Sequence, residues 1–326
     1  MFTEIMIGVG ILGGYLLTSL LCFKYPHLLH RNPKRNFKKC RNIAHRGGAG
    51  ENLENTMMAF RHAVDVGSEM LEIDVHLTND NEVVVSHDNN LLRTTGVDKE
   101  ITKTSSSDLP ELLPELPVNF DKDNICTGNG DRKIPTLREL FEEFPNIPIN
   151  IDIKDNDDRL IEEVNNLIVK YKREHLCVWG NFHSVVVDKC YKKNPNVGLL
   201  FSIKQCAKLA LLTYSGLLPF VPIKETHFEV FLPLSLYRNA HEFVKTNNAL
   251  HFGVWAFKKI LLRRYIIEHL QKRGILVYLW VLNTDEEFQE AMQLGVDGIM
   301  TDYPSRLASF LQSNQAFNNS QSPVTS

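Results

Sequence analysis

Two acidic residues one position apart give the first indication of chemistry in this chain. Glu72 and Asp74 flank Ile73 inside an apolar, β-branched segment, residues 69–76. Alternate residues of a β-strand point to the same side, so both carboxylates would face one way. Burying them is costly unless a divalent cation such as Mg²⁺ or Ca²⁺ compensates their charge. We therefore expect Glu72 and Asp74 to bind a metal; the alternative is a pair of solvated carboxylates on a strand surface.

A second polar strand repeats the pattern at residues 147–153. Asp152 and Lys154 share a face between buried isoleucines. Asp152 would be a third metal ligand, and the Lys154 ammonium would meet an anionic oxygen. The alternative is a simple Asp–Lys ion pair on a solvated face.

Two histidines lie at the ends of other predicted strands, His45 in Ala-His-Arg-Gly-Gly and His87 in Val-Val-Val-Ser-His-Asp. A single histidine is commonly a structural hydrogen-bonding group. Two histidines near an acidic metal site could instead move protons to and from reacting oxygens. Arg46 adds a guanidinium that can bind phosphate oxygens. Together these residues suit metal-assisted cleavage of a phosphodiester.

The elements that must position these residues alternate between strands and helices. Gly274 and Gly295 lie where helices should end. The predicted strands are residues 42–46, 69–76, 82–87, 147–153, 176–182, 197–202, 228–234, 276–283 and 296–300. The predicted helices are residues 54–66, 136–144, 157–173, 184–193, 257–273, 284–294 and 304–312.

Such alternation predicts a parallel sheet covered by helices, and a TIM (β/α)₈ barrel fits best because the polar residues cluster at strand ends. The chain lacks the glycine fingerprint of a dinucleotide-binding fold and the P-loop of a nucleotide-binding fold. Residues 88–134 interrupt the alternation and are rich in Thr, Ser, Asp, Pro and Gly. We expect them to form an inserted cap over the barrel mouth.

A series of short motifs resembles the glycerophosphodiester phosphodiesterase family. In order, they are A-H-R-G-G (44–48), L-E-N-T (53–56), E-I-D-V (72–75), L-T-x-D (77–80), V-x-S-H-D (84–88), I-D-I-K (151–154), W-V-L-N (280–283) and G-x-D-G-I-M-T-D-Y-P (295–304). The resemblance extends from about residue 42 to residue 310. An apolar N-terminus and the L-L-P-F-V-P-I stretch (217–223) resemble the membrane-bound lysophospholipase D branch.

The resemblance implies roles for individual residues. His45 and His87 would be the acid–base pair, Arg46 and Lys154 would bind phosphate, and Glu72 and Asp74 would bind one divalent cation, Mg²⁺ or Ca²⁺. The family usually has Glu where this chain has Asp152, so the shorter side chain could alter the metal preference. Glu54 and Asn55 would support the site. Trp280 would line the substrate wall, although a plain core tryptophan is an equal alternative.

The resemblance also implies an activity. A lysophospholipid has a free glycerol hydroxyl that can attack its own phosphate, and water then opens the cyclic product. The expected enzyme is a lysophospholipase D that converts lysophosphatidylcholine-like lipids and N-acyl lysophosphatidylethanolamine to lysophosphatidic acid. The alternative is a glycerophosphodiesterase acting on water-soluble, deacylated head groups. A phosphoinositide phospholipase C, a zinc amidohydrolase barrel and an inactive lipid-binding module fit the residues less well.

The ends of the chain differ from its body. Residues 5–23 are uncharged and long enough to cross a bilayer, and seven basic residues follow without an acid. We expect an uncleaved anchor over residues 1–24; a cleaved signal peptide is the alternative, but the basic n-region and small-residue cleavage site that it needs are missing. Positive flanks stay cytoplasmic, so a basic linker over 25–41 and a catalytic domain over 42–312 should face the cytosol. The expected location is the endoplasmic reticulum and perinuclear membranes. Residues 313–326 are rich in Asn, Ser and Gln and are expected to be a disordered tail.

Composition agrees with a globular enzyme. The 326 residues are 43% hydrophobic and 23% charged, and the net charge of −3 argues against a basic nucleic-acid binder. Six cysteines without a C-x-x-C pair fit reduced thiols. The apolar residues 209–223 are too short and proline-rich for an ordinary span, which leaves core packing, a lipid-dipping loop or a true span as alternatives. The expected partners are a lysophospholipid and the bilayer; no protein partner is indicated.

Overall fold

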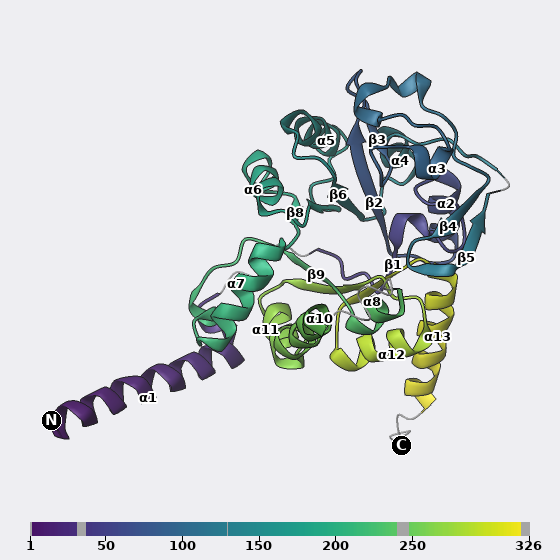
Figure 1. Cartoon of the computed structure of the whole chain (residues 1–326). Coiled ribbons are helices and arrows are strands. Elements are labelled where there is room, and N and C mark those ends of the chain that lie inside the picture. Colours follow the sequence, from purple (N-terminus) through teal and green to yellow (C-terminus); the bar gives the residue numbers. More distant parts are fainter. Residues whose placement is uncertain (1, 31–36, 129, 240–247, 321–326) are drawn as a thin grey trace.

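The computed structural model describes residues 2–30, 37–128, 130–239 and 248–320. Within these ranges a parallel sheet curls into a barrel with helices outside it, and a long helix projects from the body (Figure 1). The parallel strands are, in order around the sheet, β8 (Gly198–Leu199), β7 (Cys177–Gly180), β6 (Ile149–Ile153), β2 (Met70–Leu77), β1 (Asn42–Ala44), β11 (Gly298–Thr301), β10 (Leu276–Trp280) and β9 (His227–Phe231).

A single parallel bridge between Leu200 and His227 joins the two ends of this sheet, so the barrel is nearly closed. β3 (Val83–Val85) pairs antiparallel with β2. The predicted TIM barrel is therefore confirmed. Most strands are shorter than predicted, because backbone pairing stops before the polar residues at the strand ends.

The helices that cover the barrel begin where side chains satisfy their first amides. Thr56, Thr136, Ser202 and Thr284 each accept a backbone N–H as N-caps, and Thr136 and Thr284 form capping boxes with Glu139 and Glu287. The covering helices are α2 (Met57–Asp65), α4 (Leu137–Glu143), α5 (Asp158–Lys170), α6 (Ser184–Lys193), α7 (Ile203–Tyr214), α8 (Pro233–Asn239), α10 (Asn248–Ile260), α11 (Arg264–Lys272), α12 (Asp285–Leu294) and α13 (Pro304–Ser320).

Two helical predictions need correction. The predicted helix over residues 257–273 is wrong as one element, because the chain breaks between α10 and α11. Leu261 and Leu262 turn into the core there, and Arg263 is extended. The last helix, α13, runs to Ser320, beyond the boundary at residue 312 where a disordered tail was expected. Residues 321–326 lie outside the described residues.

The insertion at residues 88–134 forms its own small structure beside the barrel mouth. It contains α3 (Leu92–Thr95), the short 3₁₀ turns η3 (Ile101–Lys103) and η4 (Ser106–Asp108), and an antiparallel hairpin of β4 (Glu115–Val118) and β5 (Asp121–Thr127). Phe120 lies in the turn of the hairpin. This turn reaches the site, as described below.

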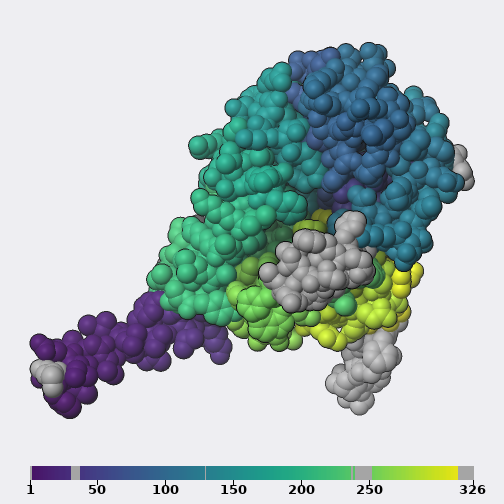
Figure 2. Space-filling model, viewed as in Figure 1, coloured from purple at the N-terminus to yellow at the C-terminus, as the bar shows by residue number. Residues whose placement is uncertain are grey.

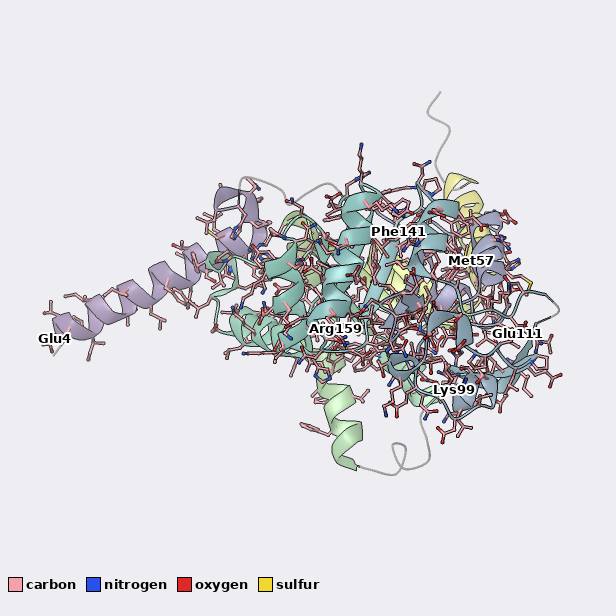
Figure 3. The ribbon with its side chains drawn as sticks, turned by 90° about the horizontal axis from the view of Figure 1, so that it is seen from above. Glu4, Met57, Lys99, Glu111, Phe141 and Arg159 are labelled. Carbon is pink, nitrogen blue, oxygen red and sulfur yellow. The ribbon has the colours of Figure 1, made fainter. Side chains whose placement is uncertain are left out.

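The N-terminal helix α1 (Phe2–Lys24) is both long enough and apolar enough to cross a membrane. It projects from the body, and its labelled residue Glu4 lies at the far tip (Figures 1 and 3). The 3₁₀ turn η1 (Pro26–Leu28) follows it. Three of the seven linker cations, Arg31, Lys34 and Arg35, lie outside the described residues.

Three hydrophobic clusters hold the barrel together. One fills the interior and includes Ile43, Met70, Val178, Tyr278 and Met300. Two larger clusters lie between the strands and the outer helices. The six cysteines are unpaired, and five of them are buried. The sparse cysteines therefore contribute packing and no cross-link.

Candidate active site

The two acidic strands lie side by side with their polar residues facing the barrel interior. β2 and β6 pair in a register that sets Glu72 opposite Asn150 and Asp74 opposite Asp152. The intervening residues Leu71, Ile73 and Val75 pack outward against helices. Two-residue periodicity thus brings four polar side chains to one side, as the sequence predicted.

Asp74 lies at the centre of a dense set of positive and amide partners. Its Oδ1 is 2.7 Å from Lys154 Nζ, and its Oδ2 is 3.3 Å from Arg46 Nε. Asn55 Nδ2 donates to the same Oδ2 at 3.1 Å. Burial opposes ionisation, but Arg46 and Lys154 outweigh it and hold the pKa of Asp74 well below its ordinary value. Asp74 is therefore an anion.

Asp152 shares Lys154 with Asp74. Lys154 Nζ donates to Asp152 Oδ2 at 2.7 Å, and Asn181 Nδ2 donates to Oδ1 at 3.3 Å. Burial raises the pKa of Asp152 despite the neighbouring Lys154. Within residues 2–30, 37–128, 130–239 and 248–320, no three Asp, Glu, His or Cys side chains are arranged to hold a metal ion. The ammonium of Lys154 lies between the two aspartates.

Glu72 and Glu229 are the carboxyl groups that this arrangement leaves short of positive charge. Burial and then Asp74 raise the pKa of Glu72 to about 7. Burial raises the pKa of Glu229 to about 8; its Oε2 accepts from Asn150 at 2.7 Å, and its Oε1 is buried without a hydrogen-bond partner. Two under-compensated carboxyl groups facing one cavity match the oxygen donors that a hard divalent cation prefers. The donor set therefore fits such a cation.

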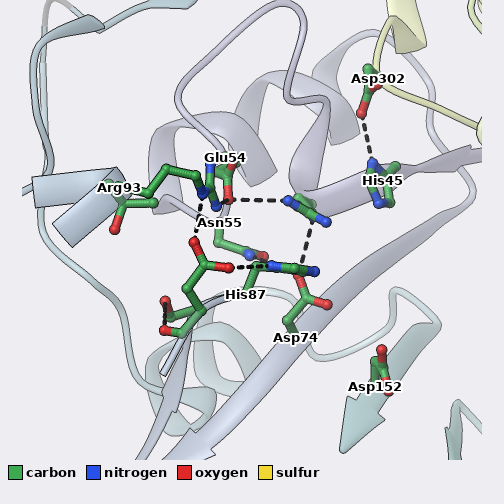
Figure 4. A network of polar contacts seen from close by, with 12 residues as sticks. His45, Glu54, Asn55, Asp74, His87, Arg93, Asp152 and Asp302 are labelled. Atoms are coloured by element: carbon green, nitrogen blue, oxygen red, sulfur yellow. Dashed lines mark hydrogen bonds and ion pairs between the residues drawn. The ribbon is translucent and has the colours of Figure 1, made fainter. Parts of the chain in front are cut away.

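His45 follows β1 and is held by a residue from the other end of the chain. Its Nδ1 is 2.6 Å from Asp302 Oδ1 (Figure 4). This leaves Nε2 toward Glu72, 4.0 Å from Oε2. Burial alone would lower the pKa of His45, but Asp302 and Glu72 raise it above its ordinary value. His45 is thus prepared to carry a proton.

His87 follows β3 and has the opposite electrostatic bias. Its Nδ1 is 2.6 Å from Asp88 Oδ1, and Asp88 Oδ2 in turn accepts from Arg93 at 2.5 Å (Figure 4). Burial lowers the pKa of His87, and Arg46 acts in the same direction. The neutral ring can therefore accept a proton at Nε2.

Arg46 occupies a backbone conformation that few side chains adopt. Its φ is 50°, and Gly47 and Gly48 continue the turn with φ of 79° and 94°. The Arg46 amide donates to Glu72 at 2.9 Å, and its guanidinium contacts Glu54 at 3.2 Å. Glu54 also receives two hydrogen bonds from Arg93, at 2.7 and 3.1 Å. Glu54 therefore orients both arginines.

A cavity of about 200 Å³ joins these groups and has an aromatic wall. Trp280 lines it with neighbours Phe120, Phe182 and Phe231, at ring-centroid distances of 6.3, 5.6 and 6.2 Å. Phe120 also packs edge-on against His45 at 5.5 Å. Trp280 is half-buried and faces the cavity. The wall can accept apolar substrate atoms beside the polar groups.

The structure brings together the catalytic, phosphate-binding and metal candidates named from the sequence. All ten site residues named from the sequence form one connected region. The cavity is lined by His45, Arg46, Glu72, Asp74, His87, Asp152, Lys154 and Trp280, and Glu54 and Asn55 are bonded behind it.

Sequence reasoning missed Phe120, Glu229 and Asp302. Asp302 directly follows the buried strand β11, so the strand-end rule applied to the histidines could have found it. Glu229 carried a weaker signal, an acid inside an apolar strand. Phe120 carried none, because the reach of the hairpin depends on how the insertion folds.

Comparison with known proteins gives a consistent result. Residues 45–306 match the sequence profile of the glycerophosphoryl diester phosphodiesterase family. The chain is 48% identical to lysophospholipase D GDPD1 of Homo sapiens, over 94% of this chain and 96% of that protein. It is 37% identical to lysophospholipase D GDPD3 of Homo sapiens, over 93% and 94% of the two chains.

A solved structure supports the fold. The crystal structure of glycerophosphodiester phosphodiesterase from Thermotoga maritima superposes with a TM-score of 0.56 at 24% identity and covers 82% of this chain and 97% of that one.

Proposed function

Because this chain belongs to the glycerophosphoryl diester phosphodiesterase family and hydrolyses phosphodiester bonds, we propose that it is a metal-dependent lysophospholipase D. The observation that carries the proposal is the pair of histidines with opposite pKa shifts that face one cavity. Environments that push two pKa values apart create an acid and a base at the same pH. Phosphodiester cleavage needs one of each.

In the first step, the glycerol 2-hydroxyl of the substrate attacks phosphorus. His87 Nε2 accepts the hydroxyl proton as the new P–O bond forms. His45 Nε2 donates a proton to the oxygen of the head alcohol as the old P–O bond breaks. In the second step the two roles reverse, and water opens the cyclic phosphate to give lysophosphatidic acid.

The positions of the other cavity residues support this division of labour. Asp302 keeps Nε2 of His45 directed into the cavity, and Asp88 does the same for His87. Arg46 and Lys154 supply positive charge for the phosphate oxygens. The aromatic wall around Trp280 would contact the glycerol or the start of the acyl chain.

We assign the divalent cation to Glu72 and Asp74, with Asp152 as the third candidate ligand. When bound, Mg²⁺ or Ca²⁺ would polarise the phosphate and neutralise charge that develops on it. Of these three carboxyl groups, Glu72 lacks a lysine partner, and burial and Asp74 both oppose its ionisation. For Asp74 and Asp152 to bind the cation, each carboxylate must exchange its contact with Lys154 for one with the metal.

The lipid substrates and the membrane location form one part of the proposal. The names of two relatives that cover nearly the whole chain support lysophospholipids over water-soluble head groups. An apolar helix α1 that projects from the body supports a single N-terminal anchor in the endoplasmic reticulum and perinuclear membranes. The basic residues after it support a cytosolic barrel.

The direct test is purified full-length protein on a panel of substrates. We expect release of choline and of N-acylethanolamine from lysophospholipids, loss of activity with EDTA, and recovery with Mg²⁺ or Ca²⁺. Diacyl phospholipids should be inert because their 2-hydroxyl is esterified. Faster turnover of glycerophosphocholine than of any lysophospholipid would favour the water-soluble substrate class instead.

Isosteric variants test the metal assignment separately. Glu72→Gln and Asp74→Asn should weaken cation binding measured by calorimetry and abolish activity, whereas Glu111→Gln, on an exposed loop, should do neither. Asp152→Glu should change the ratio of Mg²⁺- to Ca²⁺-supported activity, since Mg²⁺ tolerates less variation in ligand geometry. If Asp152→Asn binds both cations like the wild type, Asp152 is merely the partner of Lys154.

A further inference from the structure

A group of apolar side chains is exposed where the chain turns after α7. Leu211, Tyr214, Leu217 and Phe220 are 71%, 57%, 43% and 39% exposed. We call these four residues the apolar patch. They surround the turn between α7 and the 3₁₀ turn η5 (Leu218–Phe220), while Leu209 and Leu218 point into the core. The segment at 209–223 is therefore part core and part exposed apolar surface, and it folds back rather than forming one long helix.

The turn beside the patch is hydrogen-bonded to the N-terminal helix. Tyr15 Oη donates to the Ser215 carbonyl at 2.5 Å, and Ser19 Oγ donates to the Gly216 carbonyl at 2.6 Å. The ring of Tyr15 also lies 6.4 Å from that of Phe220. Figures 1 and 2 show α7 meeting α1 where α1 leaves the body.

These contacts fix the depth of the turn relative to the apolar helix. Ser19 and Tyr15 precede Phe23, the last uncharged residue of the span, by four and eight positions. At 1.5 Å per residue they lie about 6 and 12 Å inside the apolar stretch. If α1 crosses a bilayer, the turn must follow it below the surface of the hydrocarbon.

The chemistry of the turn suits that depth. No charged residue occurs from position 209 to position 223. The hydroxyl groups of Tyr15 and Ser19 would be costly in hydrocarbon without partners, and the two carbonyls provide them. Lys208 and Lys224 bound the segment and line a groove of about 790 Å³ between α6 and α7. Lys224 is ion-paired with Asp188 there, whereas the exposed Lys208 can meet anionic headgroups.

We propose that the apolar patch is embedded in the cytosolic leaflet beside α1 and forms a second membrane contact. The inference rests on the proposed anchor role of α1 and is independent of the reaction assigned to the barrel. A helix alone would leave the barrel free to swing about its attachment. A helix with an adjoining embedded turn fixes the orientation of the barrel relative to the bilayer.

The test uses full-length protein in phosphatidylcholine–phosphatidylserine vesicles that carry a quencher on the acyl chains. Single cysteines are introduced and labelled with an environment-sensitive fluorophore. Leu217→Cys reports the patch, and Phe220→Cys is a second position in case the first variant folds poorly. Leu12→Cys, on α1, reports the anchor. Ile125→Cys, 65% exposed on the distant β5, is the matched control.

We expect blue-shifted emission and at least a twofold loss of intensity at Leu217→Cys and Leu12→Cys, and no change at Ile125→Cys. If Leu12→Cys is quenched and Leu217→Cys behaves like the control, the proposal that the patch is embedded is wrong, and the anchor role of α1 still holds. A blue shift at Leu217→Cys without quenching would mean that protein covers the patch, which also overturns the proposal. Absence of quenching at Leu12→Cys would remove the anchor and the patch together. Hydrolysis of lysophospholipid by the same samples reports the proposed reaction independently.

Discussion

At the scale of single residues, the site depends on how its carboxylates share a small number of lysine and arginine side chains. Lys154 serves Asp74 and Asp152, Arg46 serves Glu54 and Asp74, and Glu72 and Glu229 receive little compensation. The strongly shifted pKa values follow from this unequal distribution. Functional sites commonly show such shifts, because burial and close charges that perturb titration also prepare groups for proton transfer.

The partner of His45 should control the pH dependence of the reaction. Neutral His87 and protonated His45 predict a bell-shaped profile of kcat/KM, rising through the lowered pKa of His87 and falling through the raised pKa of His45. Asp302→Asn removes the carboxylate that raises the pKa of His45, so the basic limb should move to lower pH and kcat should fall about 100-fold or more.

The control for this substitution is Asp285→Asn, which alters an exposed ion pair with Arg306. It should leave the profile unchanged. An unshifted basic limb in Asp302→Asn would remove His45 from the role of proton donor.

Glu229 should destabilise the folded protein increasingly as the pH rises. Its pKa is raised from 4.5 to about 8 in the folded state. Between these values the unfolded chain releases the Glu229 proton first, so each increase in pH stabilises the unfolded state relative to the folded state. Glu229→Gln removes that penalty. In metal-free buffer we expect a gain in the free energy of unfolding of roughly 1.4 kcal/mol for each pH unit in this window, as an upper bound.

Denaturant titrations at pH 4, 6 and 8 measure this effect. The gain should vanish at pH 4, where the carboxyl group is protonated in both states. A gain that is equal at all three values would point to packing rather than charge.

At the scale of elements, the hairpin of β4 and β5 contributes to the site across a large distance in sequence. Its turn carries Phe120, whose carbonyl accepts from Asn283 at 3.2 Å and whose ring packs on His45 and Trp280. The insertion therefore supplies part of the substrate wall and shields His45 from water.

Removing this ring should weaken substrate binding more than it slows the reaction. A buried aromatic side chain contributes about 1.5–3 kcal/mol by burial alone, so Phe120→Ala should raise the KM for lysophospholipid about 10-fold or more. Ile125→Ala, on the exposed side of the same hairpin, should leave KM unchanged. A normal KM in Phe120→Ala would mean that the hairpin does not touch the substrate.

The sequence predicted these elements unevenly, for physical reasons. Strong two-residue alternation at Glu72 and Asp74 reports both a strand and its inward face, so that part of the site could be inferred without a structure. The break between α10 and α11 could not, because Leu261 and Leu262 fit a helical pattern equally well until the core draws them inward. Contacts such as His45 with Asp302 join residues 257 positions apart and depend on closure of the barrel.

At the scale of the whole molecule, the apolar helix α1 and the barrel raise the question of orientation across the membrane. The cations that follow α1 favour its C-terminal end in the cytosol. The tail contains one N-x-S glycosylation sequon, Asn318-Asn319-Ser320. In sealed microsomes, added protease should digest the barrel, and Asn318 should remain unglycosylated. Detergent-opened microsomes provide the control for protease access. Protection of the barrel in sealed vesicles would reverse the orientation.

The buried thiols have a consequence for how the folded protein meets oxidants. Burial raises the pKa of Cys40 and Cys190, and of the half-buried Cys206, to about 12, and that of Cys126 and Cys177 to about 11. Thiolate is the reactive form, so these five groups should resist peroxide while the chain stays folded. They lie in separate parts of the structure: before β1, on the hairpin strand β5, on β7, on α6 and on α7. Each thiol should react at the rate at which its own part of the structure opens. The relative oxidation rates of the five thiols therefore report which parts of the fold open first.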